Sequence, residues 1–235
     1  MPDKLNLGAG PWWSKAGWQT ADHKSSQPRS AGNTKFQACS FDVVFSSHML
    51  EHVPHFRISA VLRDINRVLR PGGTLRLLCP DLAKVARIFV EGDQESAKQL
   101  LAEDPSLRTD LGLGGLLVNL VVSPGRDTFL FDRNGKFIGG YAHLYAYDFE
   151  MLSTLLERNG FKQVRQMGFC KSEVPDFHEP LHLAYREPVW VNEQDWEVDQ
   201  ERGPVTTGFD RDPFHSLIVE AVSYTHLTLP TISRV

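Results

Sequence analysis

Two histidines and a glutamate that could bind a metal stand close together in SSHMLEHVPH, residues 46–55. His48, Glu51 and His52 have the spacing H-x-x-E-H. In this pattern two imidazoles on one helix face can bind zinc, and the carboxylate can act as a base in hydrolysis. Pro54 disfavours helical geometry at Val53, so a helix here would be short, and the sequence marks no third ligand. We therefore expect no metal and a different role for these side chains.

A glycine pair near the N-terminus could form part of a ligand site. Gly8 and Gly10 follow a short apolar run, and without a Cβ they allow a ligand to approach the backbone closely. An ordinary tight turn is the alternative interpretation. Trp13 stands where the dinucleotide fingerprint G-x-G-x-x-G needs its third glycine. The pattern therefore argues against an NAD-dependent oxidoreductase.

Composition narrows the classes of protein further. The chain has 235 residues, of which 41% are hydrophobic and 23% charged, as in an ordinary globular domain. A net charge of −4 and a pI of about 6.1 argue against a protein that depends on nucleic-acid phosphates. Cys39, Cys79 and Cys170 lie far apart, as expected of reduced thiols in a cytoplasm. We expect a cytoplasmic protein without a signal peptide, because Pro2-Asp3-Lys4 leads directly into a strand-like run, and without a membrane span, because the apolar run at 111–122 is too short.

The first half of the chain has the pattern of alternating strands and helices, which indicates a parallel sheet in an α/β fold. Residues 41–47, FDVVFSS, read as a strand buried on both faces. Residues 56–70 place six apolar side chains on one helix face, and Pro71-Gly72-Gly73 would end this helix. The other predicted elements are strands at 4–10, 17–22 and 74–80 and a helix at 81–92, which Asp81 would cap.

The second half is less regular. Residues 94–104 read as a helix, and residues 129–140 as a hairpin around Asn134-Gly135. Residues 147–161 predict a helix with Asp148 as N-cap. The last two predicted strands are 162–169 and 216–221.

Residues 222–235, VSYTHLTLPTISRV, differ in character from the chain before them. Their first six residues are encoded by GTCTCTTATACACATCT, which resembles a transposon adapter used for sequencing libraries. We expect residues 1–221 to form one domain, with 222–235 a non-native tail. A genuine C-terminal extension is the alternative.

The order of these motifs resembles the class I S-adenosylmethionine-dependent methyltransferases, and more narrowly the small bacterial type-11 methyltransferases. The resemblance covers residues 4–90 and 143–221, and its most specific part is the pair LEHV and LRPGG. It implies a Rossmann-like, mostly parallel sheet with an antiparallel last strand. It also implies insertions at about 105–147 and 171–213 within a single methyltransferase domain.

The resemblance implies S-adenosyl-L-methionine as the cofactor. Gly8, Ala9 and Gly10 would face its methionine part, and Asp22 would accept hydrogen bonds from its ribose hydroxyls. Two positions depart from the family: Asn6 stands where an acid is frequent, and Ser30 is the nearest match to the acid that contacts adenine. The loop after residues 41–47 would lie at the carboxyl edge of the sheet, where α/β proteins bind ligands, and adds Ser46, Ser47 and His48 to the cofactor site.

The implied reaction transfers a methyl group to an acceptor, for which we expect a small molecule or a glycan precursor. A general base is optional, and the candidates are His48, Asp81 and His143. The acceptor would lie under the variable part at 105–147, with 171–213 as a lid. The aromatic residues that could line its site, or pack in the core instead, are Trp12, Trp13, Tyr141 and Tyr145. The alternative function is a regulatory or scaffold protein that binds S-adenosylmethionine without catalysis.

Overall fold

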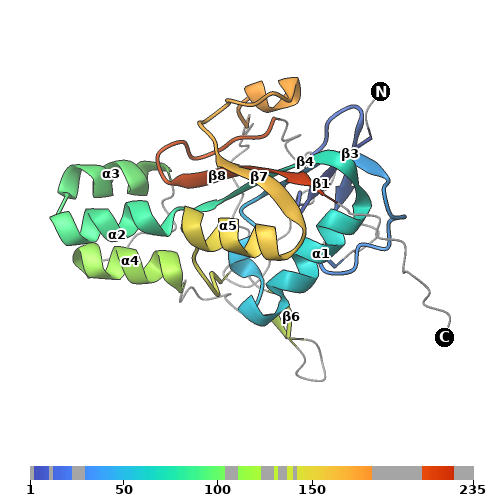
Figure 1. The fold of residues 1–235 in the computed structure, drawn as a ribbon. Helices are drawn as coiled ribbons and strands as arrows, with labels where there is room; N and C mark the ends of the chain where they lie inside the picture. Colours follow the sequence, from blue (N-terminus) through green and yellow to red (C-terminus); the bar gives the residue numbers. More distant parts are fainter. Residues whose placement is uncertain are drawn as a thin grey trace, which may run out of the picture.

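A six-stranded mixed sheet forms the centre of the computed structural model (Figure 1). The strand order is β2-β1-β3-β4-β8-β7, and within this sheet β8 runs antiparallel to both of its neighbours. The strands are β1 (Lys4–Leu7), β2 (Trp18–Ala21), β3 (Phe41–Ser47), β4 (Leu69–Pro80), β7 (Phe161–Gln166) and β8 (Ser216–Ser223). The structure describes residues 3–10, 13–22, 30–103, 111–122, 130–131, 137–139, 142–181 and 208–224.

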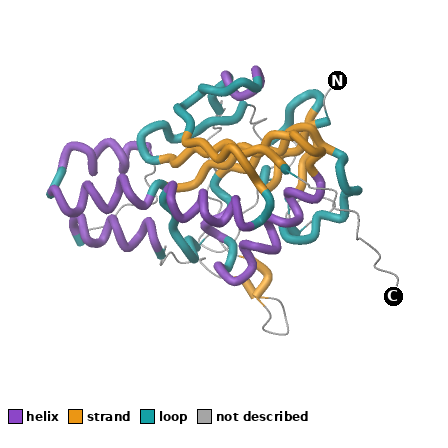
Figure 2. Tube along the Cα trace, viewed as in Figure 1, coloured by secondary structure: helices purple, strands orange, loops and turns teal. Residues whose placement is uncertain are grey.

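One face of the sheet is covered by two amphipathic helices, α1 (Ile58–Val68) and α5 (Phe149–Arg158). Both lie along the same side of the sheet in the tube view (Figure 2). Their apolar side chains pack on alternate residues of the central strands, because successive strand residues point to opposite faces. Asp148 caps α5, since its carboxylate accepts a hydrogen bond from the Met151 amide at 2.8 Å.

Aromatic side chains cover the opposite face of the sheet. Phe177, from the short 3-10 helix η4 (Pro175–His178), and Phe209 pack against Trp13, Trp18 and Phe45. This segment lies above the sheet in Figure 1, on the side away from α1 and α5. The described residues between β7 and β8 thus cover the face that a second layer of helices covers in many α/β folds.

A polar contact fastens this segment to the edge of the sheet. Oδ2 of Asp176 accepts hydrogen bonds from Nζ of Lys4 and from Nε1 of Trp18, each at 2.7 Å. Burial raises the pKa of Asp176, but these two donors outweigh it, and the pKa is lowered.

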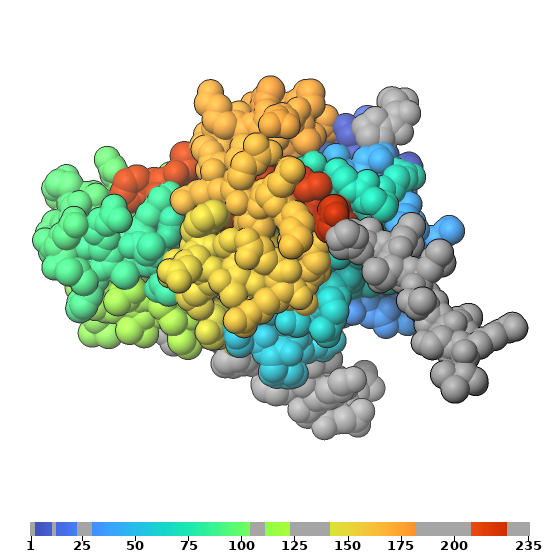
Figure 3. Space-filling model, in the orientation of Figure 1, coloured from blue at the N-terminus to red at the C-terminus, as the bar shows by residue number. Residues whose placement is uncertain are grey.

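Three further helices form a lobe with a core of its own: α2 (Leu82–Glu91), α3 (Gln94–Glu103) and α4 (Gly112–Val121). This lobe occupies the left end of the space-filling view (Figure 3). Leu116 and Leu120 of α4 pack with Val85 and Ile88 of α2. The apolar run at 111–122 is therefore a helix of this lobe, and among the described residues no helix is long and apolar enough to cross a membrane.

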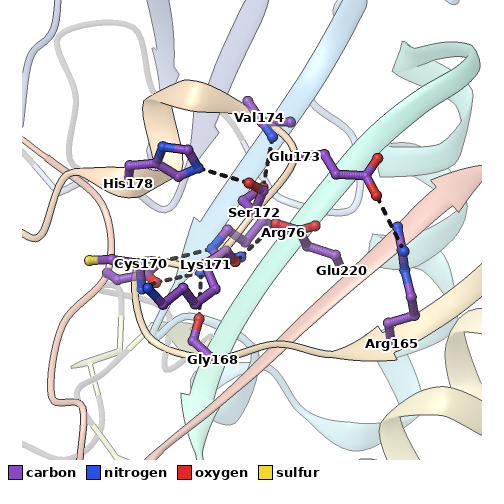
Figure 4. Close-up of polar contacts among 11 residues, drawn as sticks. Arg76, Arg165, Gly168, Cys170, Lys171, Ser172, Glu173, Val174, His178 and Glu220 are labelled. Atoms are coloured by element: carbon purple, nitrogen blue, oxygen red, sulfur yellow. Dashed lines mark hydrogen bonds and ion pairs between the residues drawn. The ribbon is translucent and has the colours of Figure 1, made fainter.

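A buried ion cluster ties the segment between β7 and β8 to the centre of the sheet (Figure 4). The guanidinium of Arg76 on β4 is completely buried and pairs with Asp210 and with Glu220 of β8. Its Nη1 also donates to the carbonyl of Lys171 at 3.1 Å. Asp210 in turn accepts the amide of Cys170 at 2.7 Å. One arginine thereby holds two segments that flank the aromatic face.

The predicted fold class is confirmed, and several element boundaries differ from those predicted. The helix predicted over 56–70 begins as a 3-10 turn, η2 (His55–Arg57), and ends at Val68, because Leu69 already has extended geometry and starts β4. β8 continues past Ala221 to Ser223, so the last strand is two residues longer than expected. The predicted hairpin is present as β5 (Leu130–Phe131) paired with β6 (Phe137–Gly139), while its turn lies outside the described residues.

Candidate functional site

The candidate site lies at the edge of the sheet where β1, β3 and β4 end. Parallel strands bring their carboxyl ends to the same edge, and the antiparallel β8 contributes its first residue there. The loop after β1, the loop after β3 and the cap of α2 therefore meet in one region.

The glycine loop and Asp22 are joined directly. The amide of Gly10 donates to Oδ2 of Asp22 at 3.1 Å, and the amide of Gly8 donates to the carbonyl of Ala21 at 2.8 Å. The φ angle is 79° at Gly8 and 69° at Gly10, and L side chains rarely adopt such positive values. A Cβ at Gly10 would meet no described atom within 4 Å, so open space borders the backbone there. The loop thus leaves room for a ligand beside the buried carboxylate of Asp22.

Gly8 has a different reason to lack a side chain. A Cβ at Gly8 would lie 2.6 Å from Cγ of Met49, in the loop after β3. The same position is 4.0 Å from Oγ of Ser46. Gly8 therefore allows the loops after β1 and β3 to pack closely, which brings Ser46 to the glycine loop.

Two hydroxyls at the end of β3 are available for a ligand. Oγ of Ser46 and Oγ of Ser47 are both buried and have no hydrogen-bond partner among the described residues. Such atoms are usually satisfied in folded proteins, so their position at this edge fits a polar ligand. Asn6 lies buried in β1 beside β3, and Ala9 lies half-buried in the loop itself.

Ser30 is not brought to this cluster by any described contact. It is exposed and bridges to Asn33 in a tight turn, with the Asn33 amide donating to its carbonyl at 2.9 Å. The residues that follow pack against the core on the α1 side, including Phe36, which stacks edge-on against Phe41. The structure gives Phe36 a core role, and the adenine contact of Ser30 stays a prediction.

His48 is held at both ring nitrogens. Nδ1 lies 3.3 Å from Oε1 of Glu51, and Nε2 lies 3.0 Å from Oγ of Ser216 and 3.7 Å from Oδ2 of Asp212. His48 has a positive φ of 48° and precedes the short 3-10 helix η1 (Leu50–His52). The two histidines of H-x-x-E-H therefore do not share a helix face, because His48 stands outside the helix.

Glu51 is a buried carboxylate, with a side chain only 1% exposed. No described hydrogen bond reaches either of its oxygens. Burial alone raises its pKa, but the contact with His48 and the charges of His48, His52 and His143 outweigh burial and lower the pKa to about 2. Its backbone carbonyl accepts the amides of Leu144 and Tyr145, at 2.7 and 3.3 Å. Glu51 thereby fixes the segment before α5 against the loop after β3.

That segment carries His143 into contact with His52. The two rings lie 5.1 Å apart, and Nδ1 of His143 is 2.7 Å from the carbonyl of Leu120 on α4. Nδ1 of His52 is 2.9 Å from the carbonyl of Ala142. Burial lowers the pKa of His143, which favours its neutral form. His143 therefore lies beside Glu51 and His52 with its Nε2 unengaged by any described residue.

Asp81 serves as the N-cap of α2, as expected from the sequence. Its Oδ1 accepts the amides of Ala83 and Lys84 at 3.0 and 3.3 Å, and its side chain is buried. These bonds give Asp81 a structural role through Oδ1, and a role as a base stays a prediction for Oδ2, which lies 3.9 Å from Nζ of Lys84.

Of the aromatic residues suggested for the acceptor site, the two that are described pack in the protein. Trp13 is buried in the aromatic face and donates from Nε1 to the carbonyl of Gly208 at 2.8 Å. Tyr145 packs against the core and stacks on His55 at 4.0 Å between ring centres. Trp12 and Tyr141 lie outside the described residues.

A comparison with protein families identifies part of this chain. A family model described as Methyltransferase domain matches residues 15–77. This segment matches a methyltransferase domain. It runs from just before β2, through β3 and α1, into β4, and so contains Asp22, the loop after β3 and the LRPGG run. The resemblance to type-11 methyltransferases is confirmed there, and the match supports S-adenosylmethionine as the cofactor.

Solved structures of similar fold include several methyltransferases. A SAM-dependent methyltransferase from Methanosarcina mazei has 12% identity and a TM-score of 0.46, covering 96% of this chain and 93% of its own. A putative S-adenosylmethionine-dependent methyltransferase from Listeria monocytogenes has 14% identity and a TM-score of 0.40, with the same coverage. A putative methyltransferase from Bacillus halodurans has 12% identity and a TM-score of 0.42, covering 95% and 92%. No curated protein matches the chain.

Around His48, three residues come from parts of the chain that the sequence did not connect with the loop after β3. Asp212 and Ser216 contact His48, and His215 lies with its ring 5.6 Å from that of His48. Glu103, at the end of α3, contacts Nδ1 of His215 at 3.0 Å. No spacing in the sequence signals these partners, because they meet only where β8 returns to the carboxyl edge.

Proposed function

We propose that this chain transfers the methyl group of S-adenosyl-L-methionine to an acceptor molecule. The observation that carries the proposal is the direct link between the glycine loop after β1 and the buried Asp22 after β2. One ligand at this edge can touch both, and the family match covers Asp22.

The residues present fit this cofactor. Open space at Gly10 admits a ligand against the backbone, and Asp22 offers a carboxylate beside it. Ser46 and Ser47 add two buried hydroxyls without described partners. Gly8, Ala9 and Gly10 would hold the methionine part, and Asp22 the ribose. When bound, the cofactor supplies a methyl group on a sulfonium, whose neutral sulfur is a good leaving group.

The protein's own contribution is then to align donor and acceptor and to exclude water. Of the three candidates for a base, His143 retains a ring nitrogen that no described residue engages. His48 instead bridges Glu51 to the start of β8 and acts as a positioning residue. Asp81 caps α2 through Oδ1, and its Oδ2 lies 3.9 Å from Nζ of Lys84.

Binding of S-adenosylmethionine by isothermal titration tests the cofactor site. Charge-assisted hydrogen bonds are worth about 1.5–3 kcal/mol, so we expect Asp22→Ala to weaken binding roughly 10- to 100-fold. Asp22→Asn keeps an acceptor for the Gly10 amide and should weaken binding less. Asp42→Ala, which removes a half-exposed carboxylate paired with Arg70 at 2.7 Å, should leave binding unchanged.

A second pair of variants distinguishes a clash with the ligand from strain in the backbone. Gly10→Val should nearly abolish binding. Gly17→Val is the matched control, because Gly17 also has a positive φ and open space around a Cβ, yet it lies in an exposed turn before β2. Equal losses in both variants, or no detectable binding to the wild type at millimolar ligand, would remove the basis for this site.

Turnover tests the reaction itself. Labelled S-adenosylmethionine should transfer its methyl group repeatedly to a component of a cell extract, fractionated into small molecules and glycan precursors. Tight cofactor binding with no acceptor methylated in any fraction would favour the alternative, a binding protein without catalysis.

A further inference from the structure

Three potential metal ligands meet beside the loop after β3. A carboxylate oxygen of Glu51 and one ring nitrogen each of His52 and His143 lie within 4.8 Å of one another. Glu51 and His52 come from η1, and His143 comes from the segment before α5. One of the two grounds for expecting no metal was the lack of a third ligand, and the fold provides one in His143.

The hydrogen bonds of the two histidines determine which nitrogen is available. Nδ1 of His52 and Nδ1 of His143 each face a backbone carbonyl, of Ala142 and Leu120, at 2.9 and 2.7 Å. A carbonyl only accepts, so each Nδ1 must carry the proton and donate it. In a neutral ring the lone pair is then on Nε2. Metal-binding histidines commonly show this arrangement, with the other ring nitrogen donating to a carbonyl or carboxylate.

Glu51 is buried, and no described hydrogen bond reaches either carboxylate oxygen. Outside the cluster, the ring of His48 contacts this carboxylate, with Nδ1 3.3 Å from Oε1 of Glu51. One ring nitrogen of each histidine and one oxygen of Glu51 thus lie together, and the tautomers leave Nε2 as the accepting nitrogen of both rings. Burying an ionised carboxylate is unfavourable unless it is compensated, and a cation bound by all three groups would compensate it together with His48.

We propose that Glu51, His52 and His143 bind one divalent transition-metal ion of the zinc class. Zinc bonds to nitrogen and oxygen are about 2.0–2.2 Å, so small rotations of these side chains bring all three atoms around one ion. Two histidines and a carboxylate form a three-ligand set that leaves a coordination position open. Mg²⁺ and Ca²⁺ prefer oxygen ligands and fit this set poorly.

A neighbouring cluster offers a second set of ligands but is already compensated. His48, Asp212 and His215 also lie within 4.8 Å of one another. There Asp212 forms an ion pair with Arg211, and Nε2 of His48 contacts the Ser216 hydroxyl. The cluster of Glu51, His52 and His143 has no arginine or lysine in its described contacts, which is why we assign the metal to it.

The experiment measures metal binding in the absence of S-adenosylmethionine, so its outcome is independent of the proposed methyl transfer. The full chain is stripped with a chelator and titrated with Zn²⁺, and metal content is measured after desalting. We expect about one zinc per chain, a higher melting temperature with zinc because the ion binds the folded state, and no displacement by excess Mg²⁺. Co²⁺ in place of zinc should give visible absorption bands.

Variants assign the site. Removing a group that hydrogen-bonds to a metal ligand weakens metal binding about 10- to 100-fold, so removing a ligand itself should weaken binding at least about 100-fold. We expect this loss in Glu51→Gln, His52→Ala and His143→Gln. His55→Ala removes an exposed histidine three residues from His52, and His215→Ala removes a ligand of the other cluster; both should bind zinc as the wild type does.

Two results would overturn the proposal. One is a wild type that binds no stoichiometric zinc and shows no rise in melting temperature, since this measurement needs no variant to fold. The other is loss of zinc in His215→Ala with full retention in His143→Gln, which would place the metal in the cluster around His48. Melting curves of each metal-free variant show whether a loss of binding reflects unfolding.

Discussion

Removing the buried charge of Arg76 should destabilise the fold strongly. Arg76→Met keeps an unbranched side chain of similar reach but deletes the guanidinium that faces Asp210 and Glu220. Two carboxylates, both 4% exposed or less, would then be left without their cation. The amide of Cys170, which also binds Asp210, would lose a fixed partner. The segment that covers the aromatic face should loosen first.

The size of the effect follows from the burial. Breaking a buried ion pair by removing one partner costs about 3–5 kcal/mol in the free energy of unfolding. For a chain of this length about 1 kcal/mol shifts the melting temperature by about 2–4 °C, which gives a drop of about 6–20 °C. Urea unfolding followed by tryptophan fluorescence, together with calorimetry at neutral pH, measures both quantities.

Arg165→Met is the matched control. Arg165 lies on β7, and its pair with Glu173 is 3.5 Å long and largely exposed, at 50% and 83% of the two side chains. β8 lies between the strands of the two arginines, Arg76 on β4 and Arg165 on β7, and Figure 4 labels both side chains. Exposed pairs contribute about 0–1 kcal/mol, so this variant should unfold close to the wild type.

A triple variant tests the physical cause. Arg76→Met combined with Asp210→Asn and Glu220→Gln removes the uncompensated charges while keeping acceptors for the backbone. It should be more stable than Arg76→Met alone by at least about 1 kcal/mol, because removing the remaining carboxylates relieves their desolvation. A loss below about 1 kcal/mol for Arg76→Met, or a triple variant less stable than the single one, would refute this reasoning.

Three further predictions concern the ends and surface of the fold. A chain ending at Ala221 should melt at a lower temperature than one ending at Tyr224, because the last residues of β8 pair with both neighbouring strands. The Tyr224 amide also donates to the carbonyl of Gly160, just before β7. Equal melting curves would contradict this. Iodoacetamide should modify exposed Cys39 in the folded protein and Cys79 only after unfolding, since burial raises the pKa of Cys79; peptide mass mapping reads this out. The pKa of Asp176 is lowered in the fold, so Asp176→Asn should destabilise the protein at neutral pH, and its difference from the wild type should shrink as pH falls through that pKa in urea titrations.

Local chemistry in the sequence was enough to predict most elements. The helix at Phe149–Arg158 follows from an apolar stripe and from Asp148, whose cap needs only the next three residues. The strand at Phe41–Ser47 follows from a run that is apolar on both faces. The glycine loop and Asp22 were predicted to contact one cofactor, and the parallel register of β1 and β2 brings both to the ends of neighbouring strands.

Boundaries were less predictable, because neighbouring strands extend elements beyond their local pattern. Pro71-Gly72-Gly73 predicts a stop, yet β4 begins at Leu69 because that residue pairs with Phe41 across the sheet. Likewise β8 continues to Ser223, which pairs with Phe161. The run at 111–122 has no marked polar face, so its helix becomes recognisable only from the lobe that buries it.

Which histidine faces which carboxylate was decided by the tertiary structure alone. The H-x-x-E-H spacing suggests that His48 and His52 act together, but a positive φ at His48 turns it toward β8, while His52 meets His143. Arg76 and Asp210 are likewise 134 positions apart and meet inside the fold. Side-chain periodicity reports only on neighbours within a few residues, whereas these contacts depend on how distant segments return to one edge of the sheet.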